Sequence, residues 1–114
     1  MTVGTRDDLA RIFAALADPT RVAIVDRLAR GDATVKELTA PFELTQQAVS
    51  RHLRVLEEAG LVSRRRQAQA RPASLEVDRL IEVMSWIDTQ RREWLDRHAR
   101  LGRHLARLQE DQQQ

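Results

Sequence analysis

Apolar residues recur every three or four positions over most of this chain, a spacing typical of amphipathic α-helices. The breaks between the apolar stretches have helix-capping chemistry. Asp18 stands before Pro19, an N-cap followed by a residue favoured in the first turn, and Thr34 has the capping-box spacing to Glu37. Pro41 ends the short helix that starts after Thr34. The pattern therefore predicts helices over residues 7–16, 19–29, 35–40 and 46–59.

The helix predicted over residues 46–59 has two faces of different chemistry. Thr45 can cap it, because a threonine hydroxyl accepts a hydrogen bond from an early backbone N–H. One face gathers the apolar side chains of Ala48, Val49, Leu53 and Leu56. The other face gathers Gln46, Gln47, Ser50, Arg51 and Arg54. Amide, hydroxyl and guanidinium groups hydrogen-bond base edges and phosphates. A solvated helix of any small domain can show the same pattern, so the surroundings of this helix decide between the two interpretations.

The helical period is lost after Gly60. Residues 61–67 and 73–77 are short and extended in character, which predicts a two-stranded hairpin with residues 68–70 at its tip. Pro72 has no N–H to donate to a strand ladder, so we expect it at an edge or a bulge.

The helical period returns over residues 79–109, with alternating steps of four and three residues. This heptad seam consists of Leu80, Met84, Ile87, Arg91, Trp94, His98, Leu101, Leu105 and Leu108. About thirty residues of helix reach roughly 45 Å, which a domain this small cannot cover. The seam predicts a partner helix, which a second copy of the chain would supply. In the alternative, the chain bends at Gly102 and folds back on its own domain.

Together these elements predict a mostly α fold with a small β-hairpin. The 114 residues suffice for a single domain, residues 1–114. Two helices joined by a short turn, the second with polar residues early in it, form a helix-turn-helix. We therefore predict a winged helix-turn-helix of five helices and a two-stranded wing. Its parts are two helices over residues 7–30, a helix-turn-helix over 35–59, a wing over 61–77 and a long dimerisation helix over 79–109.

Charge is unevenly placed on this chain. The formal net charge is +2, but six arginines face only two glutamates between Ser50 and Arg71, so that window carries +4. A basic zone on a nearly neutral protein is typical of a polyanion-binding surface. No apolar run approaches the length of a membrane span and no secretory signal is visible, so we expect a cytoplasmic location and no membrane partner.

Catalytic and cofactor chemistry finds no support in the sequence. The chain has no cysteine, and its four glycines are isolated, so no phosphate-binding loop is present. Ser50 and His52 are two residues apart on a helix and point away from each other, which excludes a nucleophile–base pair. We expect no enzymatic activity and no cofactor.

The order of these motifs resembles that of the ArsR family of bacterial winged-helix repressors. The resemblance rests on the Ala-Asp-Pro-Thr-Arg stretch at 17–21, on residues 28–31, and on Ala48 to Val62 followed by three arginines at 64–66. It covers about residues 8–90. The family implies a homodimer joined through the first and last helices, with its recognition helices in successive major grooves of a pseudo-palindromic operator. It also implies transcriptional repression that an inducing signal relieves.

The resemblance assigns roles to particular residues. The recognition-helix positions are Thr45, Gln46, Gln47, Ser50, Arg51 and Arg54, and the wing positions are Arg64, Arg65, Arg66 and Arg71. The expected dimer interface consists of Leu9, Phe13, Met84, Ile87, Trp94, Leu101 and Leu105. His52 lies near the apolar side of its helix, so we interpret it as a packed, hydrogen-bonded histidine in preference to a base reader.

The metal-sensing pattern of the family is missing here. Its paired cysteines have no counterpart in residues 35–40, and Asp88-Thr-Gln90 lacks the histidine of the last-helix site. His98 and His104 are six residues apart and do not face each other. We expect no metal and a double-stranded DNA partner, with an inducer of unknown identity. Two alternatives stay open: a metal-responsive repressor of the same fold, and a winged-helix module that binds an acidic protein surface without specific DNA binding.

Overall fold

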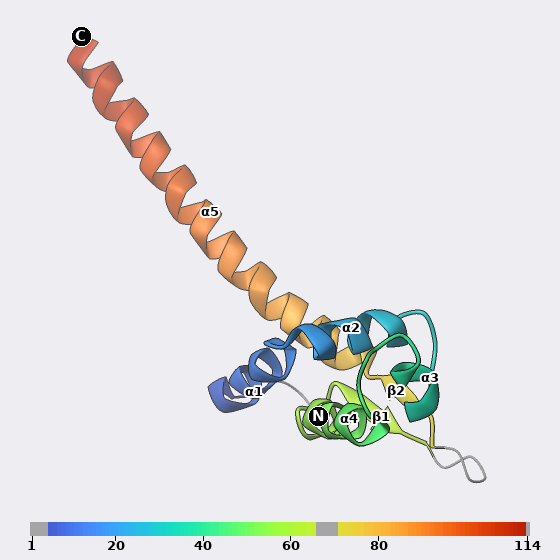
Figure 1. Cartoon of the computed structure of the whole chain (residues 1–114). Helices are drawn as coiled ribbons and strands as arrows, with labels where there is room; N and C mark the ends of the chain where they lie inside the picture. The colour runs from blue at the N-terminus through green and yellow to red at the C-terminus, as the bar shows by residue number, and fades with distance from the viewer. Residues whose placement is uncertain (1–4, 66–70, 114) are drawn as a thin grey trace. The chain divides into compact units, whose positions relative to one another are not determined.

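The computed structural model describes residues 5–65 and 71–113. The chain forms two compact units, Met1–Glu82 and Val83–Gln114, which we describe separately. The described ranges hold five helices and two strands, in the order expected for a winged helix-turn-helix (Figure 1). They are α1 (Arg6–Leu16), α2 (Pro19–Leu28), α3 (Val35–Thr39), α4 (Gln46–Glu58), β1 (Val62–Arg64), β2 (Ala73–Leu75) and α5 (Val77–Gln113). The predicted fold class is confirmed.

Helices α1 to α4 each begin with a side-chain cap. The caps of α2, α3 and α4 explain why their starts could be located from local sequence, whereas α1 begins at Arg6, one residue before the predicted start. The caps are Thr5, Asp18, Thr34 and Thr45. At α3 the capping box is complete: the Glu37 N–H donates to Thr34 Oγ1, and the Thr34 N–H donates to Glu37 Oε1, both at 3.2 Å. These bonds satisfy backbone donors that the first turn of a helix leaves unpaired.

The first unit has a core built from the apolar faces of its helices. Helix α4 lies at the centre, since it packs against α1, α2, α3 and β1. Its Val49, Leu53 and Leu56 are completely buried, as the two-faced pattern predicts. Among the residues that the structure describes, the other large side chains that are fully buried are Ile12, Ile24, Leu38 and Leu61. This burial fixes which face of α4 is turned outward.

Strands β1 and β2 pair antiparallel, with Ser63 opposite Ser74. They are shorter than the predicted 61–67 and 73–77, and the predicted tip at 68–70 lies outside the described residues. The Arg65 N–H donates to the Pro72 carbonyl at 3.1 Å, and the proline takes part in the hairpin only as an acceptor because it has no N–H.

Two connections tie the hairpin to the helices. Ala33 and Ala73 exchange backbone hydrogen bonds of 3.2 and 2.7 Å, a β-bridge that sequence periodicity did not predict. Gly60 ends α4 with φ of +78°, a conformation that glycine adopts without strain. The turn at Gly60 lets β1 begin directly after α4.

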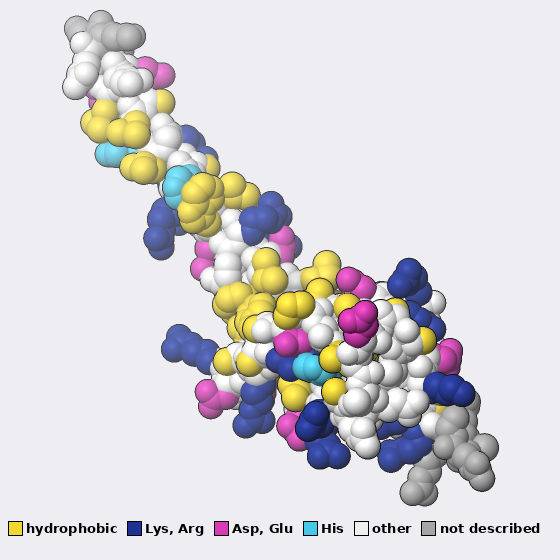
Figure 2. Space-filling model, in the orientation of Figure 1, with side chains coloured by type: hydrophobic (Ala, Val, Ile, Leu, Met, Phe, Trp, Pro, Cys, Tyr) yellow, Lys and Arg dark blue, Asp and Glu magenta, His cyan; other side chains and the backbone are white. Residues whose placement is uncertain are grey.

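Helix α5 has 37 residues and extends beyond the predicted 79–109 at both ends. It continues through Gly102, so the alternative in which the chain bends at this residue is wrong. Apolar side chains recur along the second unit and remain exposed, among them Trp94, Leu101 and Leu105 (Figure 2). None of the helices in the described ranges has the length and apolarity that a membrane span requires.

Candidate nucleic-acid interface

The outward face of α4 gathers the polar side chains expected to meet DNA. Five of them line one hollow of about 710 Å³: Gln46, Gln47, Ser50, Arg51 and Arg54. All are exposed except Ser50, which is half-buried. Thr45 differs in role, because its hydroxyl accepts from the Ala48 N–H at 3.1 Å and so caps the helix. The structure thus brings the predicted recognition positions together on one surface.

The hydrogen-bonding groups of this surface are not used within the protein. Among residues 5–65 and 71–113, no hydrogen bond or ion pair involves the side chains of Gln46, Gln47, Ser50, Arg51 or Arg54. A glutamine amide can pair with an adenine edge, and an arginine can pair with guanine or a phosphate. Val49, Leu53 and Leu56 beneath are fully buried, so α4 presents these groups from a fixed support.

The wing arginines fall into two classes. Arg65 and Arg71 are exposed, whereas Arg64 is half-buried. Arg64 donates from Nε and Nη2 to the carbonyl of Arg71, at 3.2 and 3.1 Å, and so braces the hairpin. Sequence reasoning missed this role because it depends on the strand register. Arg66, also predicted to contact DNA, lies outside the described residues.

Arg21 connects three helices behind the polar face of α4. Its Nε donates to the Ala15 carbonyl at 2.6 Å and its Nη2 to the Ala14 carbonyl at 3.4 Å, both near the end of α1. Its Nη1 lies 3.2 Å from His52 Nδ1 in the middle of α4. His52 is therefore packed and hydrogen-bonded, which confirms the interpretation from sequence.

Asp18 completes this cluster at the start of α2. Its Oδ2 accepts from the Arg21 backbone N–H at 3.0 Å and lies 3.8 Å from His52 Nδ1. The backbone hydrogen bond from Arg21 lowers the pKa of the Asp18 carboxyl, and the charge of the Arg21 guanidinium adds to this effect. Nδ1 can accept from Arg21 only in a neutral ring that carries its proton on Nε2. The capping motif pointed to Asp18, but no local signal pointed to its proximity to His52.

The residues predicted for the dimer interface are exposed, with one exception. Leu9 is a core residue of the single chain, at 8% exposed. The others leave substantial apolar surface to solvent: Phe13, Met84, Ile87, Trp94, Leu101 and Leu105. Trp94 stacks on His98 with ring centroids 3.6 Å apart, and His98 Nδ1 lies 2.9 Å from the Trp94 carbonyl. No group of three or more metal-ligating side chains occurs in the described part of the chain.

Residues 18–64 match a family model described as "Bacterial regulatory protein, arsR family". The chain is 33% identical over 76 residues to the transcriptional repressor SdpR of Bacillus subtilis, covering 67% of this chain and 84% of that protein. It is 41% identical over 78 residues to the HTH-type transcriptional regulator Rv2034 of Mycobacterium tuberculosis, covering 68% and 73%.

Solved structures show the same architecture. An ArsR-like transcriptional regulator from Rhodococcus sp. RHA1 superposes with a TM-score of 0.78 at 30% identity, over 87% of this chain and 93% of that one. The ArsR family transcriptional regulator RHA00566 superposes with a TM-score of 0.73 at 36% identity, over 82% and 96%. The matched family region contains the whole of α4 and β1.

Proposed function

Because the chain belongs to the ArsR family of bacterial regulatory proteins, we propose that it is a homodimeric repressor that binds a pseudo-palindromic operator. Proteins of this family are transcriptional regulators and not enzymes. The observation that carries the proposal is the outward face of α4, whose amide and guanidinium groups have no partner among the described residues. A regulator of this kind acts at the chromosome, so we place it in the cytoplasm.

In this proposal α4 enters the major groove, and its side chains make two kinds of contact with DNA. Gln46 and Gln47 stand at the start of the helix, where recognition helices contact base edges. Arg51 and Arg54 lie further along the same face, within reach of phosphates or guanine. Arg65 and Arg71 of the wing add phosphate contacts.

The proposed dimer uses the apolar stripe of α5. A pair of chains would bury Met84, Ile87, Trp94, Leu101 and Leu105, which a single chain leaves exposed, with Phe13 from α1. Leu9 has little surface left to contribute. Two joined chains present two copies of α4, which matches the symmetry of an inverted repeat.

Selection of binding sites from a pool of random duplexes tests this proposal. We expect enrichment of an inverted repeat, because each half-site contacts one α4. A pool that remains random after several rounds would contradict specific DNA binding and favour a protein-interaction module.

The two kinds of contact proposed for α4, to base edges and to phosphates, lead to a separate prediction. Arg54→Ala should weaken binding to the selected site and to random DNA alike, because a phosphate contact is independent of sequence. Gln47→Ala should change the preferred base at one position and cost about 1–3 kcal/mol on the selected site. Anisotropy titrations of each variant on the selected site and on a random duplex measure these changes in affinity. Equal losses on the two duplexes for both variants would contradict it.

A further inference from the structure

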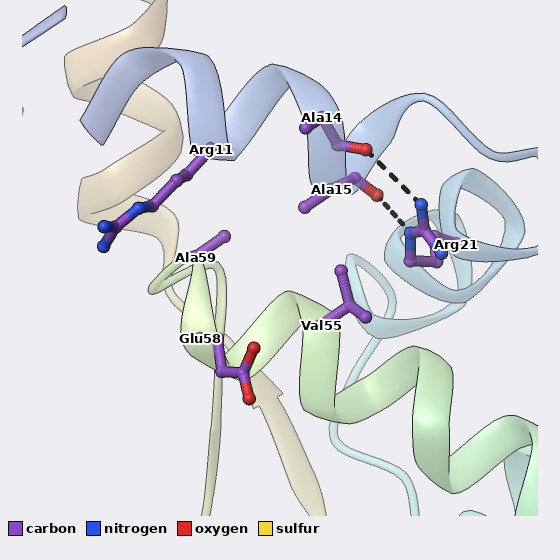
Figure 3. A pocket seen from close by; sticks show the side chains of 7 residues that line it. All are labelled: Arg11, Ala14, Ala15, Arg21, Val55, Glu58 and Ala59. Atoms are coloured by element: carbon purple, nitrogen blue, oxygen red, sulfur yellow. Dashed lines mark hydrogen bonds between the residues drawn. The ribbon is translucent and has the colours of Figure 1, made fainter. Parts of the chain in front are cut away.

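A hollow of about 640 Å³ lies between α1 and α4, in a part of the first unit that the proposed DNA contacts do not use (Figure 3). Its apolar wall is made of small side chains, from Ala14 and Ala15 of α1 and from Val55 and Ala59 on the α4 side. Because these side chains are short, the two helices leave room between them. The volume lies within the range of small-molecule sites in proteins.

Charged groups at the hollow favour an anion. Arg11 and Arg21 line it together with Glu58, so the lining carries one net positive charge. In the described part of the chain, Arg11 forms no hydrogen bond or ion pair. Arg21 engages three of the five N–H groups of a guanidinium, on Ala14, Ala15 and His52, and two remain for a ligand.

We propose that this hollow binds a small organic monocarboxylate and that its occupation weakens DNA binding. The apolar body of the ligand would cover Val55 and the alanines, and its carboxylate would accept from the free N–H groups of Arg21. Arg11, at the other end of the hollow in Figure 3, would add positive potential without contacting the carboxylate. Glu58 disfavours ligands with a second negative charge.

The effect on DNA rests on the proposed function and follows from the position of Arg21. The same guanidinium that lines the hollow also holds His52 of α4. A carboxylate that draws Arg21 toward itself competes with the bond to His52, which lies on the helix that carries Gln47 and Arg51. Binding of ligand and of DNA then oppose each other reciprocally.

Benzoate, with benzamide as its neutral counterpart, tests the site on the full chain without DNA. Titration followed by backbone NMR should give shifts confined to residues around the hollow, with Kd of about 1 mM for benzoate and weaker binding of benzamide. Arg11→Gln should weaken benzoate binding about threefold, and Glu58→Gln should strengthen it by a similar factor. Arg6→Gln and Glu57→Gln make the same charge changes on the same two helices outside the hollow and should leave the Kd unchanged.

The proposed site would be overturned if benzoate caused no chemical-shift changes, if the changes were scattered over the surface, or if benzamide caused equal changes. The site would also be overturned if the control variants Arg6→Gln and Glu57→Gln changed the benzoate Kd as much as Arg11→Gln and Glu58→Gln do.

Anisotropy titrations of the selected DNA site with and without saturating benzoate test the coupling. With benzoate we expect about a fivefold or larger loss of DNA affinity. In Arg11→Gln, the loss at the same benzoate concentration should be smaller. Unchanged DNA affinity despite NMR-confirmed occupation would overturn the coupling. A failure of the proposed function looks different, because the ligand-free chain would then show no sequence-specific binding at all.

Discussion

Arg21 helps to position α4, although it is not expected to touch DNA. It joins the end of α1 to His52 in α4 through side-chain hydrogen bonds. The sequence indicated that His52 is packed, because the helical wheel places it beside the apolar face. Its partner could not be predicted, since the two residues are 31 positions apart.

Removal of the His52 ring should loosen this connection. His52→Ala leaves Arg21 Nη1 without its acceptor, and we expect a loss of about 1 kcal/mol in the free energy of unfolding. DNA affinity should fall as well, although the residue makes no proposed base contact. Urea unfolding and anisotropy titration measure the two effects. His104→Ala, at an exposed position on α5, is the matched control; equal effects from the two variants would contradict this role.

Asp18 predicts a dependence of stability on pH. Its folded-state pKa is lowered below the ordinary value of 3.8, chiefly by the backbone hydrogen bond from Arg21. The stabilisation is therefore present above pH 3.8 and is lost as the pH falls through the lower, folded-state pKa. Asp18→Asn retains an N-cap oxygen but removes the charge.

Urea unfolding at neutral and acidic pH should show Asp18→Asn to be less stable than the natural chain at neutral pH. The difference should shrink in acid, where both side chains are uncharged. Asp26→Asn, at an exposed position on α2, serves as control. A difference that stays constant between the two pH values would show that the charge of Asp18 is irrelevant.

At the scale of elements, the structure follows the sequence wherever local chemistry sets a boundary. The starts of α2 and α4 coincide with the predicted positions, because Asp18 and Thr45 cap them. The strands are shorter than predicted, since their ends depend on pairing across the hairpin. Ala33 enters the sheet through one bridge, and a single residue has no periodicity to detect.

The wing provides a prediction that distinguishes two neighbouring arginines. Arg65 is exposed, so Arg65→Ala should remove one phosphate contact and reduce the slope of log affinity against log salt by about 0.9. Arg64→Ala should instead lower the stability of the hairpin, because it removes two bonds to the Arg71 carbonyl. Salt titrations of DNA binding and thermal unfolding of both variants separate these outcomes. If Arg64→Ala reduced the salt slope and Arg65→Ala lowered the stability of the hairpin, Arg64 would be the DNA contact.

At the scale of the whole molecule, the heptad seam of α5 is the feature that one chain cannot satisfy. Sequence reasoning located the seam but ended the helix too early, because the polar residues before Gln113 continue the helix without an amphipathic signal. The seam indicates that a partner helix is needed. The pairing of two chains along it is a property of the assembly and is not encoded in the periodicity of one chain.

Disruption of the seam should separate the chains. Leu101→Lys places a charge in the proposed interface, and we expect monomers in sedimentation velocity at concentrations where the natural chain dimerises. Ala99→Lys adds the same charge at an exposed position of the same helix outside the seam, and it should remain dimeric. Identical sedimentation of the two variants would argue against this interface.

The stoichiometry of the complex on the selected inverted repeat tests the central claim most directly. Sedimentation equilibrium of the chain with the full site and with an isolated half-site gives the number of chains per duplex and the affinity of each complex. We predict two chains on the full site, bound far more tightly than on the half-site or on random DNA. One chain per duplex, or equal affinity for all three duplexes, would contradict the account.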